Sequence, residues 1–136
     1  EESNYREVNQ LRSVLEKQAY VQACALISGE GKEKAGAIIN RMENGDLEER
    51  MRSDHELHHL VFEYSQNPLL ILLMDALSEI IRSEGEVVLR QAASIDTEEW
   101  IALHKNIAIC LIEGNIQEGL LALEEHYEWL ERDIKM

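Results

Sequence analysis

The sequence has little proline and little glycine. One proline and seven glycines occur among 136 residues, whereas Leu, Ile, Ala and Glu are frequent. Because proline and glycine mark turns and loops, their scarcity argues against a β architecture, and the frequent residues favour helices. A chain of this length forms one domain with a sizeable core. The composition therefore predicts an all-α fold.

Basic residues, cysteines and long apolar runs are also scarce. Lys and Arg number 13 against 27 Asp and Glu, a net charge of −14, which argues strongly against this segment binding a nucleic-acid backbone. Cys24 and Cys110 lie in apolar helical surroundings, which predicts buried, reduced thiols. The sequence shows no signal peptide and no apolar run of the ~18 residues that span a bilayer. We therefore expect a cytoplasmic protein without membrane contact.

Apolar residues recur at helical spacing in six segments, which predicts an antiparallel bundle of about six to seven helices. The predicted helices cover residues 8–27, 33–42, 47–65, 69–90, 97–112 and 116–134.

Residues at the ends and along the faces of these segments add detail. Gly29 and Gly31 predict the end of the first helix. Asp46 and Asn67 predict N-caps, with Pro68 at the first position of the next helix. The fourth segment is apolar nearly all round at its start, which predicts a central position in the bundle. The apolar line of the first helix follows Leu11, Val14, Leu15, Gln18, Val21 and Ala25.

Two i, i+4 pairs compete for the inner face of the third segment. Asp54 and His58 follow a mostly apolar line, which predicts that they face the core. His55 and His59 follow a polar line, which predicts that they face solvent. An inward carboxylate must be paired or bound to something, so Asp54 marks a candidate site.

Two later histidines also lie on apolar helix faces. His104 aligns with Trp100 and Ile107, and His126 aligns with Leu123. One core histidine is usually structural, but a shared divalent cation would satisfy Asp54, His58, His104 and His126 together. These ligands suit Zn²⁺, taken as the first choice, and also Ni²⁺, Mn²⁺ or Fe²⁺. The alternative of histidines satisfied by hydrogen bonds alone stays open at this point.

Two arginines are candidates for binding an anionic ligand. Arg12 lies near the inner line of the first helix, and Arg82 follows two isoleucines. Either guanidinium could bind a carboxylate bidentately, and either could instead form an ordinary salt bridge.

The order of these motifs resembles a known family. Asp54-His-Glu-Leu-His58 precedes Ser65-Gln-Asn67, and His104 and His126 follow, 22 positions apart. With Arg12-Ser-Val-Leu-Glu16 near the start, the set resembles the FadR C-terminal (FCD) domain of GntR-family bacterial transcription regulators, over roughly residues 8–130. The family more often has other residues at three of the matched positions, which here are Leu57, Asn115 and Tyr127.

The resemblance implies an effector-binding and dimerisation domain over residues 1–136, with a winged helix-turn-helix domain upstream that binds operator DNA. It implies a divalent metal held by Asp54, His58, His104 and His126 at the floor of a cavity for a small organic or sugar acid. It also implies a homodimer without catalytic activity, in which the effector shifts the placement of the DNA-binding arms. Two alternatives remain: a metal-dependent hydrolase and a metal-free helical interaction module.

Overall fold

The computed structural model describes residues 2–80 and 97–134, which are helical and contain no strand. This confirms the predicted all-α fold. The helices are α1 (Glu2–Leu26), α2 (Gly29–Asn44), α3 (Leu47–Ser65), α4 (Pro68–Ile80), α6 (Thr97–Glu113) and α7 (Ile116–Ile134). Residues 81–90 of the predicted fourth helix lie outside the described residues.

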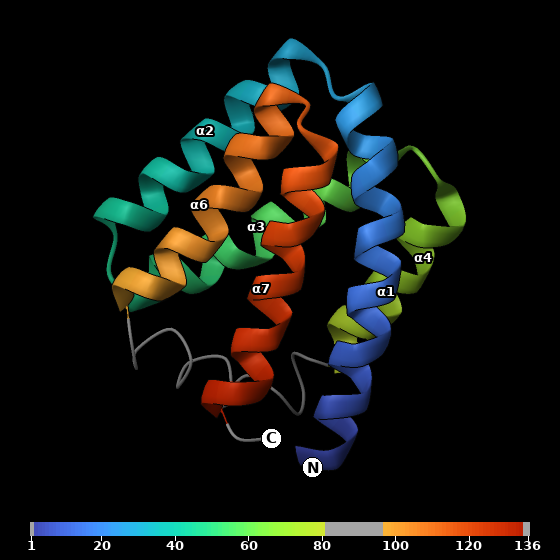
Figure 1. Cartoon of the computed structure of the whole chain (residues 1–136), viewed down its shortest axis with the longest axis vertical. Helices are drawn as coiled ribbons and strands as arrows, with labels where there is room; N and C mark the ends of the chain where they lie inside the picture. Colours follow the sequence, from blue (N-terminus) through green and yellow to red (C-terminus); the bar gives the residue numbers. More distant parts are fainter. Residues whose placement is uncertain (1, 81–96, 135–136) are drawn as a thin grey trace.

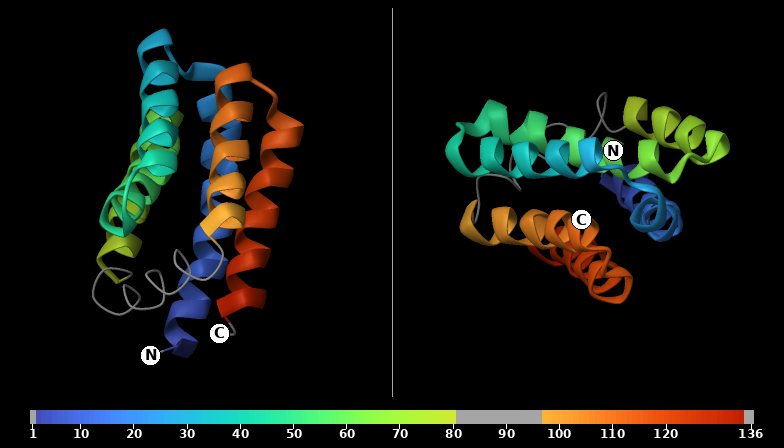
Figure 2. Two further views of the ribbon diagram at one scale, coloured as in Figure 1. Left: turned by 90° about the vertical axis from the view of Figure 1, so that its left-hand side faces the viewer. Right: turned by 90° about the horizontal axis from the view of Figure 1, so that it is seen from above.

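Helix α3 packs against α1, α2, α4 and α6, and α1 packs against α3, α4, α6 and α7. Seen from above, α2, α3 and α4 lie on one side of the molecule and α6 and α7 on the other (Figure 2). Helix α1 joins the two sides through its contacts with α3 and α7 (Figure 1). The interior between α1, α3, α6 and α7 is therefore where side chains from distant parts of the sequence meet.

Local capping explains where several helices begin. The Asp46 side chain accepts a hydrogen bond from the backbone N–H of Glu49 at 2.9 Å, and α3 starts at Leu47. Asn67 accepts from the backbone N–H of Leu69 at 3.1 Å, and Pro68 opens α4. Both predicted caps are confirmed, since each satisfies a backbone donor that the first helical turn leaves free.

The predicted role of the first two glycines is wrong. Gly29 and Gly31 lie in the first turn of α2, which begins four residues before its predicted start. Ser28 is the N-cap, and its side chain accepts a hydrogen bond from the Gly31 N–H at 3.1 Å. A Cβ at position 31 would meet the Tyr64 ring at 2.7 Å. Gly31 therefore permits a close approach of α2 and α3.

Glycine does shape the turn between α6 and α7. Gly114 has φ +73°, a left-handed backbone conformation that residues with a Cβ rarely adopt. Its N–H donates to the Leu111 carbonyl at 3.3 Å, and the Asn115 N–H donates to that of Cys110 at 2.9 Å. These bonds close the last turn of α6 and let α7 run back along it.

The predicted inner face of α1 is also wrong. Leu11, Val14 and Val21 are exposed, Val14 by 65%. The buried side of α1 instead carries polar residues at four-residue spacing, including Arg12 and Glu16. The helix is rotated by about one residue from the predicted orientation, because these charged groups find buried partners on α3 and α7.

Helix α4 is not central. Leu69 and Leu72 are exposed by 62% and 64%, and only one side of the helix, including Leu70 and Met74, is buried against α1 and α3. An apolar helix can lie at the surface of a single chain, with one of its faces buried and the opposite face exposed. Apolar composition alone therefore predicted its position wrongly.

Candidate metal centre

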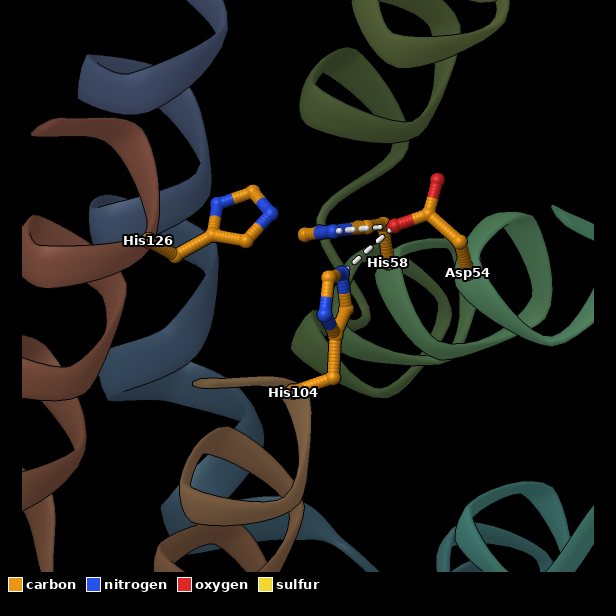
Figure 3. A group of neighbouring side chains, drawn as sticks. All are labelled: Asp54, His58, His104 and His126. Atoms are coloured by element: carbon orange, nitrogen blue, oxygen red, sulfur yellow. Dashed lines mark hydrogen bonds and ion pairs between the residues drawn. The ribbon is translucent and has the colours of Figure 1, made fainter. Parts of the chain in front are cut away.

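The four predicted ligands meet in the interior. Asp54 and His58 lie one turn apart on α3, His104 comes from α6 and His126 from α7. All four side chains are buried. One ligand atom from each lies within 4.8 Å of the others, and the rings converge on the Asp54 carboxylate (Figure 3). Four side chains of these types at such separations have the composition and spacing of a metal site.

The outer nitrogen of His104 is already used. His104 Nδ1 donates to the Trp100 carbonyl oxygen at 2.7 Å, one turn earlier on α6. A carbonyl can only accept, so Nδ1 carries the hydrogen and Nε2 faces Asp54 Oδ1 at 2.7 Å. In the neutral imidazole this Nε2 bears a lone pair, and a lone pair beside a carboxylate oxygen requires a positive charge between them.

His58 has the same arrangement. His58 Nδ1 donates to Glu16 Oε2 at 2.6 Å, while its Nε2 lies 3.3 Å from the same Asp54 oxygen and makes no hydrogen bond within the described part of the chain. Two imidazoles thus direct Nε2 at one carboxylate, and both are held from behind. This is the pattern by which outer hydrogen bonds orient histidine ligands, so the residues fit a divalent cation.

The charges of the cluster follow from burial and close pairing. Burial would raise the pKa of Asp54, but His58 and His104 outweigh it and hold this pKa well below its usual value. Burial would lower the pKa of His58, but Glu16 and Asp54 raise it to about 9. Burial, with His104 and His58 nearby, lowers the pKa of His126 well below its usual value. His126 is therefore a neutral imidazole with a lone pair at neutral pH.

The two candidate arginines have different outcomes. Arg12 is buried, and its guanidinium carbon lies 5.6 Å from the centre of the Tyr127 ring. Burial would lower the pKa of Arg12, but Tyr127, Glu16 and Asp54 raise it, so the cation persists beside the cluster. Its Nε has no hydrogen-bond partner among the described residues. Arg82 lies outside the described residues.

Sequence reasoning missed the role of two residues, Glu16 and Tyr127. Glu16 holds His58, and the Tyr127 hydroxyl donates to Glu16 Oε1. A signal for Glu16 existed, because Arg12 and Glu16 share the i, i+4 spacing of Asp54 and His58. Tyr127 had no such signal, since tyrosine on an apolar helix face is ordinary core.

The exposed histidine pair is where the sequence predicted it. His55 and His59 are both exposed, and both line a cavity of about 800 Å³ between α2, α3 and α4. Two further cavities, of about 540 and 160 Å³, lie along α1. The residues lining these three cavities include none of Asp54, His58, His104 and His126.

The buried polar cluster lies between the helices of an all-α bundle, which is where helix bundles build ligand sites from side chains on facing helices. The chain belongs to the FCD domain family, whose model matches residues 7–128. FCD domains are effector-binding regulatory domains, usually found in GntR-type regulators. A search of curated proteins gave no match. None of the described helices is long and apolar enough to cross a membrane.

Proposed function

We propose that the chain is the effector-sensing domain of a GntR-family transcription regulator, built around a divalent metal held by Asp54, His58, His104 and His126. The observation that carries the proposal is the closeness of four buried ligand atoms, all within 4.8 Å of one another. Family membership supports the regulatory role. When bound, the metal would supply a buried positive charge and a coordination position for a small anion.

Zn²⁺ is the first choice for this site. Three imidazoles and one carboxylate match the nitrogen and oxygen ligands that zinc takes in proteins. Ni²⁺, Mn²⁺ and Fe²⁺ accept the same ligands and prefer higher coordination numbers, which leave positions for an effector.

The buried charges favour an effector with one carboxylate at the cluster. The charged groups at the cluster include the carboxylates of Asp54 and Glu16, the Arg12 guanidinium and His58, whose pKa of about 9 keeps it protonated in the metal-free protein. Ligation through Nε2 requires His58 to lose this proton, so the same groups with a divalent ion carry one excess positive charge. A single carboxylate restores the balance. We propose that Arg12 helps to bind it, and we extend that role to Arg82 on the sequence argument alone.

A hydrolase is the weaker alternative. Such an enzyme needs a general base that reaches a metal-bound water. Among the described residues, the additional buried carboxylate at the cluster is Glu16, which lies behind His58 and bonds to its outer nitrogen. This placement suits orientation of a ligand rather than proton transfer, and FCD domains are not an enzyme family.

We further propose that the native protein is a cytoplasmic homodimer that binds operator DNA through a winged helix-turn-helix domain upstream of residues 1–136. Exposed Val14, Leu69 and Leu72 on the neighbouring helices α1 and α4 support a self-association surface. Residues 1–136 themselves carry a net charge of −14, which is unsuited to phosphate contacts.

Metal content tests the proposal directly. We expect tag-free protein to hold about one divalent ion per chain by elemental mass spectrometry. Chelation should lower the melting temperature by on the order of 10 °C, because loss of a ligand bound to the native state removes its stabilisation. The Asp54→Ala/His104→Ala variant should lose both the ion and any thermal shift with small carboxylic acids.

The control for this experiment is His55→Ala/His59→Ala. It removes an exposed histidine pair on α3 that has the same i, i+4 spacing as Asp54 and His58. It should keep the metal and the shift. Metal-free wild-type protein that is indifferent to chelator would overturn the metal proposal and favour the metal-free helical module.

A further inference from the structure

A chain of buried hydrogen bonds lies behind His58. The His58 ring donates through Nδ1 to Glu16 Oε2 at 2.6 Å, and the Tyr127 hydroxyl donates to the other carboxylate oxygen, Oε1. All three side chains are buried. They come from α3, α1 and α7, so the chain ties together three of the helices that surround the cluster.

Each member of this chain limits the movement of the next. With both carboxylate oxygens bonded, Glu16 cannot rotate without breaking a buried hydrogen bond, which is unfavourable where no water replaces the lost partner. A fixed carboxylate in turn fixes the ring orientation of His58 and keeps the hydrogen on Nδ1, leaving Nε2 directed at Asp54. The Arg12 guanidinium, 5.6 Å from the centre of the Tyr127 ring, adds a cation–π contact that holds Tyr127 itself.

We propose that Tyr127 is a positioning residue of the metal centre, acting through Glu16 on His58. This inference rests on the proposed metal site. Tyr127 follows the ligand His126 directly, so α7 presents one ligand to the cluster and, in the next residue, the anchor for another. Tyr127 thereby favours the metal-binding orientation of a histidine that lies 69 positions earlier in the chain.

The competing explanation is purely structural. A buried carboxylate needs hydrogen-bond donors whatever its role, and the Tyr127 hydroxyl could serve stability alone. The two explanations differ in a measurable way. A positioning role lowers metal affinity specifically, whereas a structural role lowers the stability of the metal-free protein and leaves the affinity unchanged.

Titration with Zn²⁺ against a chromophoric chelator separates them. Tyr127→Phe keeps the ring and removes only the hydroxyl, and it should weaken Zn²⁺ binding about tenfold, the lower end of effects for outer hydrogen-bond partners of ligands. The matched control is Tyr20→Phe, which also removes a buried hydroxyl, one that donates to the Ile107 carbonyl at 2.7 Å. This control should change the affinity less than about twofold while lowering stability comparably.

A double-mutant cycle tests the route through Glu16. In a Glu16→Ala background the added Tyr127→Phe change should have no further effect on Zn²⁺ affinity, because the connecting carboxylate is gone. Should Glu16→Ala not fold, Glu16→Gln takes its place, and the effect of Tyr127→Phe should shrink. The absorption bands of Co²⁺-loaded protein should change with Tyr127→Phe and not with Tyr20→Phe, since these bands report ligand geometry.

The outcomes are distinct. Wild-type protein that binds no Zn²⁺ overturns the proposed metal site and this inference with it. Wild-type protein that binds Zn²⁺ while Tyr127→Phe binds equally well overturns this inference alone. Equal weakening by Tyr127→Phe with and without Glu16 would show that Tyr127 does not act through that carboxylate.

Discussion

At the scale of single residues, the interior of this protein is organised by polar groups that share partners. Asp54 faces the Nε2 atoms of His104 and His58, and Glu16 accepts hydrogen bonds from His58 and Tyr127. Buried carboxylates are unfavourable unless each is paired, so removing any one group leaves another without its partner. The cluster is therefore retained or lost as a unit.

The two cysteines show how burial lowers the reactivity of a side chain. Both thiols are free, as the sequence predicted, although both are half-buried rather than fully buried. Burial raises the pKa of Cys24 to about 11; a hydrogen bond with Tyr20 opposes the rise and Cys110 adds to it. Because the thiolate is the reactive form, Cys24 is protected at physiological pH.

We predict slow alkylation of Cys24 in the native protein. A rise of the pKa from 9.0 to about 11 leaves about 100-fold less thiolate at pH 8. Iodoacetamide labelling followed by mass spectrometry should show that the labelling rate of Cys24 increases with pH along a titration curve whose midpoint lies near pH 11. Urea-unfolded protein is the control. A native rate at pH 8 equal to the unfolded rate would contradict the prediction.

At the scale of elements, close approach of helices depends on small residues at particular positions. Helix α7 passes Tyr20 of α1 at Gly119, where an added Cβ would overlap the tyrosine ring and hydroxyl. Tyr20 is fully buried and donates to the Ile107 carbonyl of α6. It therefore cannot move aside without breaking a contact between α1 and α6.

Gly119→Ala should lower the free energy of unfolding by about 1–3 kcal/mol, the range for overpacked interiors. Gly36→Ala is the control, because a Cβ at Gly36 on α2 meets nothing within 4 Å. That change should raise the free energy of unfolding by about 0.5–1 kcal/mol, since alanine loses less conformational freedom in a helix. Urea denaturation measures both, and equal effects of the two substitutions would refute the packing argument.

At the scale of the whole molecule, the described chain leaves an apolar surface on α1 and α4 uncovered. The exposed side chains there include Leu69 and Leu72, and the two residues between them in the sequence, Leu70 and Ile71, are also apolar. A net charge of −14 opposes association through most other surfaces. A second copy of the chain is the occupant that we propose.

Leu72→Glu should convert a dimer to a monomer in sedimentation velocity experiments at micromolar concentration, because each copy would bury an unpaired carboxylate. Ile109→Glu on α6, which makes no contact with α4, should leave the dimer intact. A wild-type monomer, or a Leu72→Glu dimer, would contradict the proposed surface.

Most of the local structure was predictable from the sequence. The range of α3, the caps at Asp46 and Asn67, and the inward direction of Asp54 and His58 follow from spacing and capping within a few residues. His104 and His126 were predictable for the same reason, since each lies on the apolar side of its own helix.

The sequence by itself thus determined the helices, the four inward candidate ligands and the family, because these depend on short-range periodicity and on the order of motifs. Only the tertiary structure decided which side of α1 is buried, that α4 lies at the surface, and that Glu16 and Tyr127 stand behind His58. The buried side of α1 and the places of Glu16 and Tyr127 depend on hydrogen bonds between residues 42 and 111 positions apart, and the place of α4 depends on its packing against α1 and α3. Helical periodicity describes one helix at a time, so it cannot show which polar groups on different helices become partners.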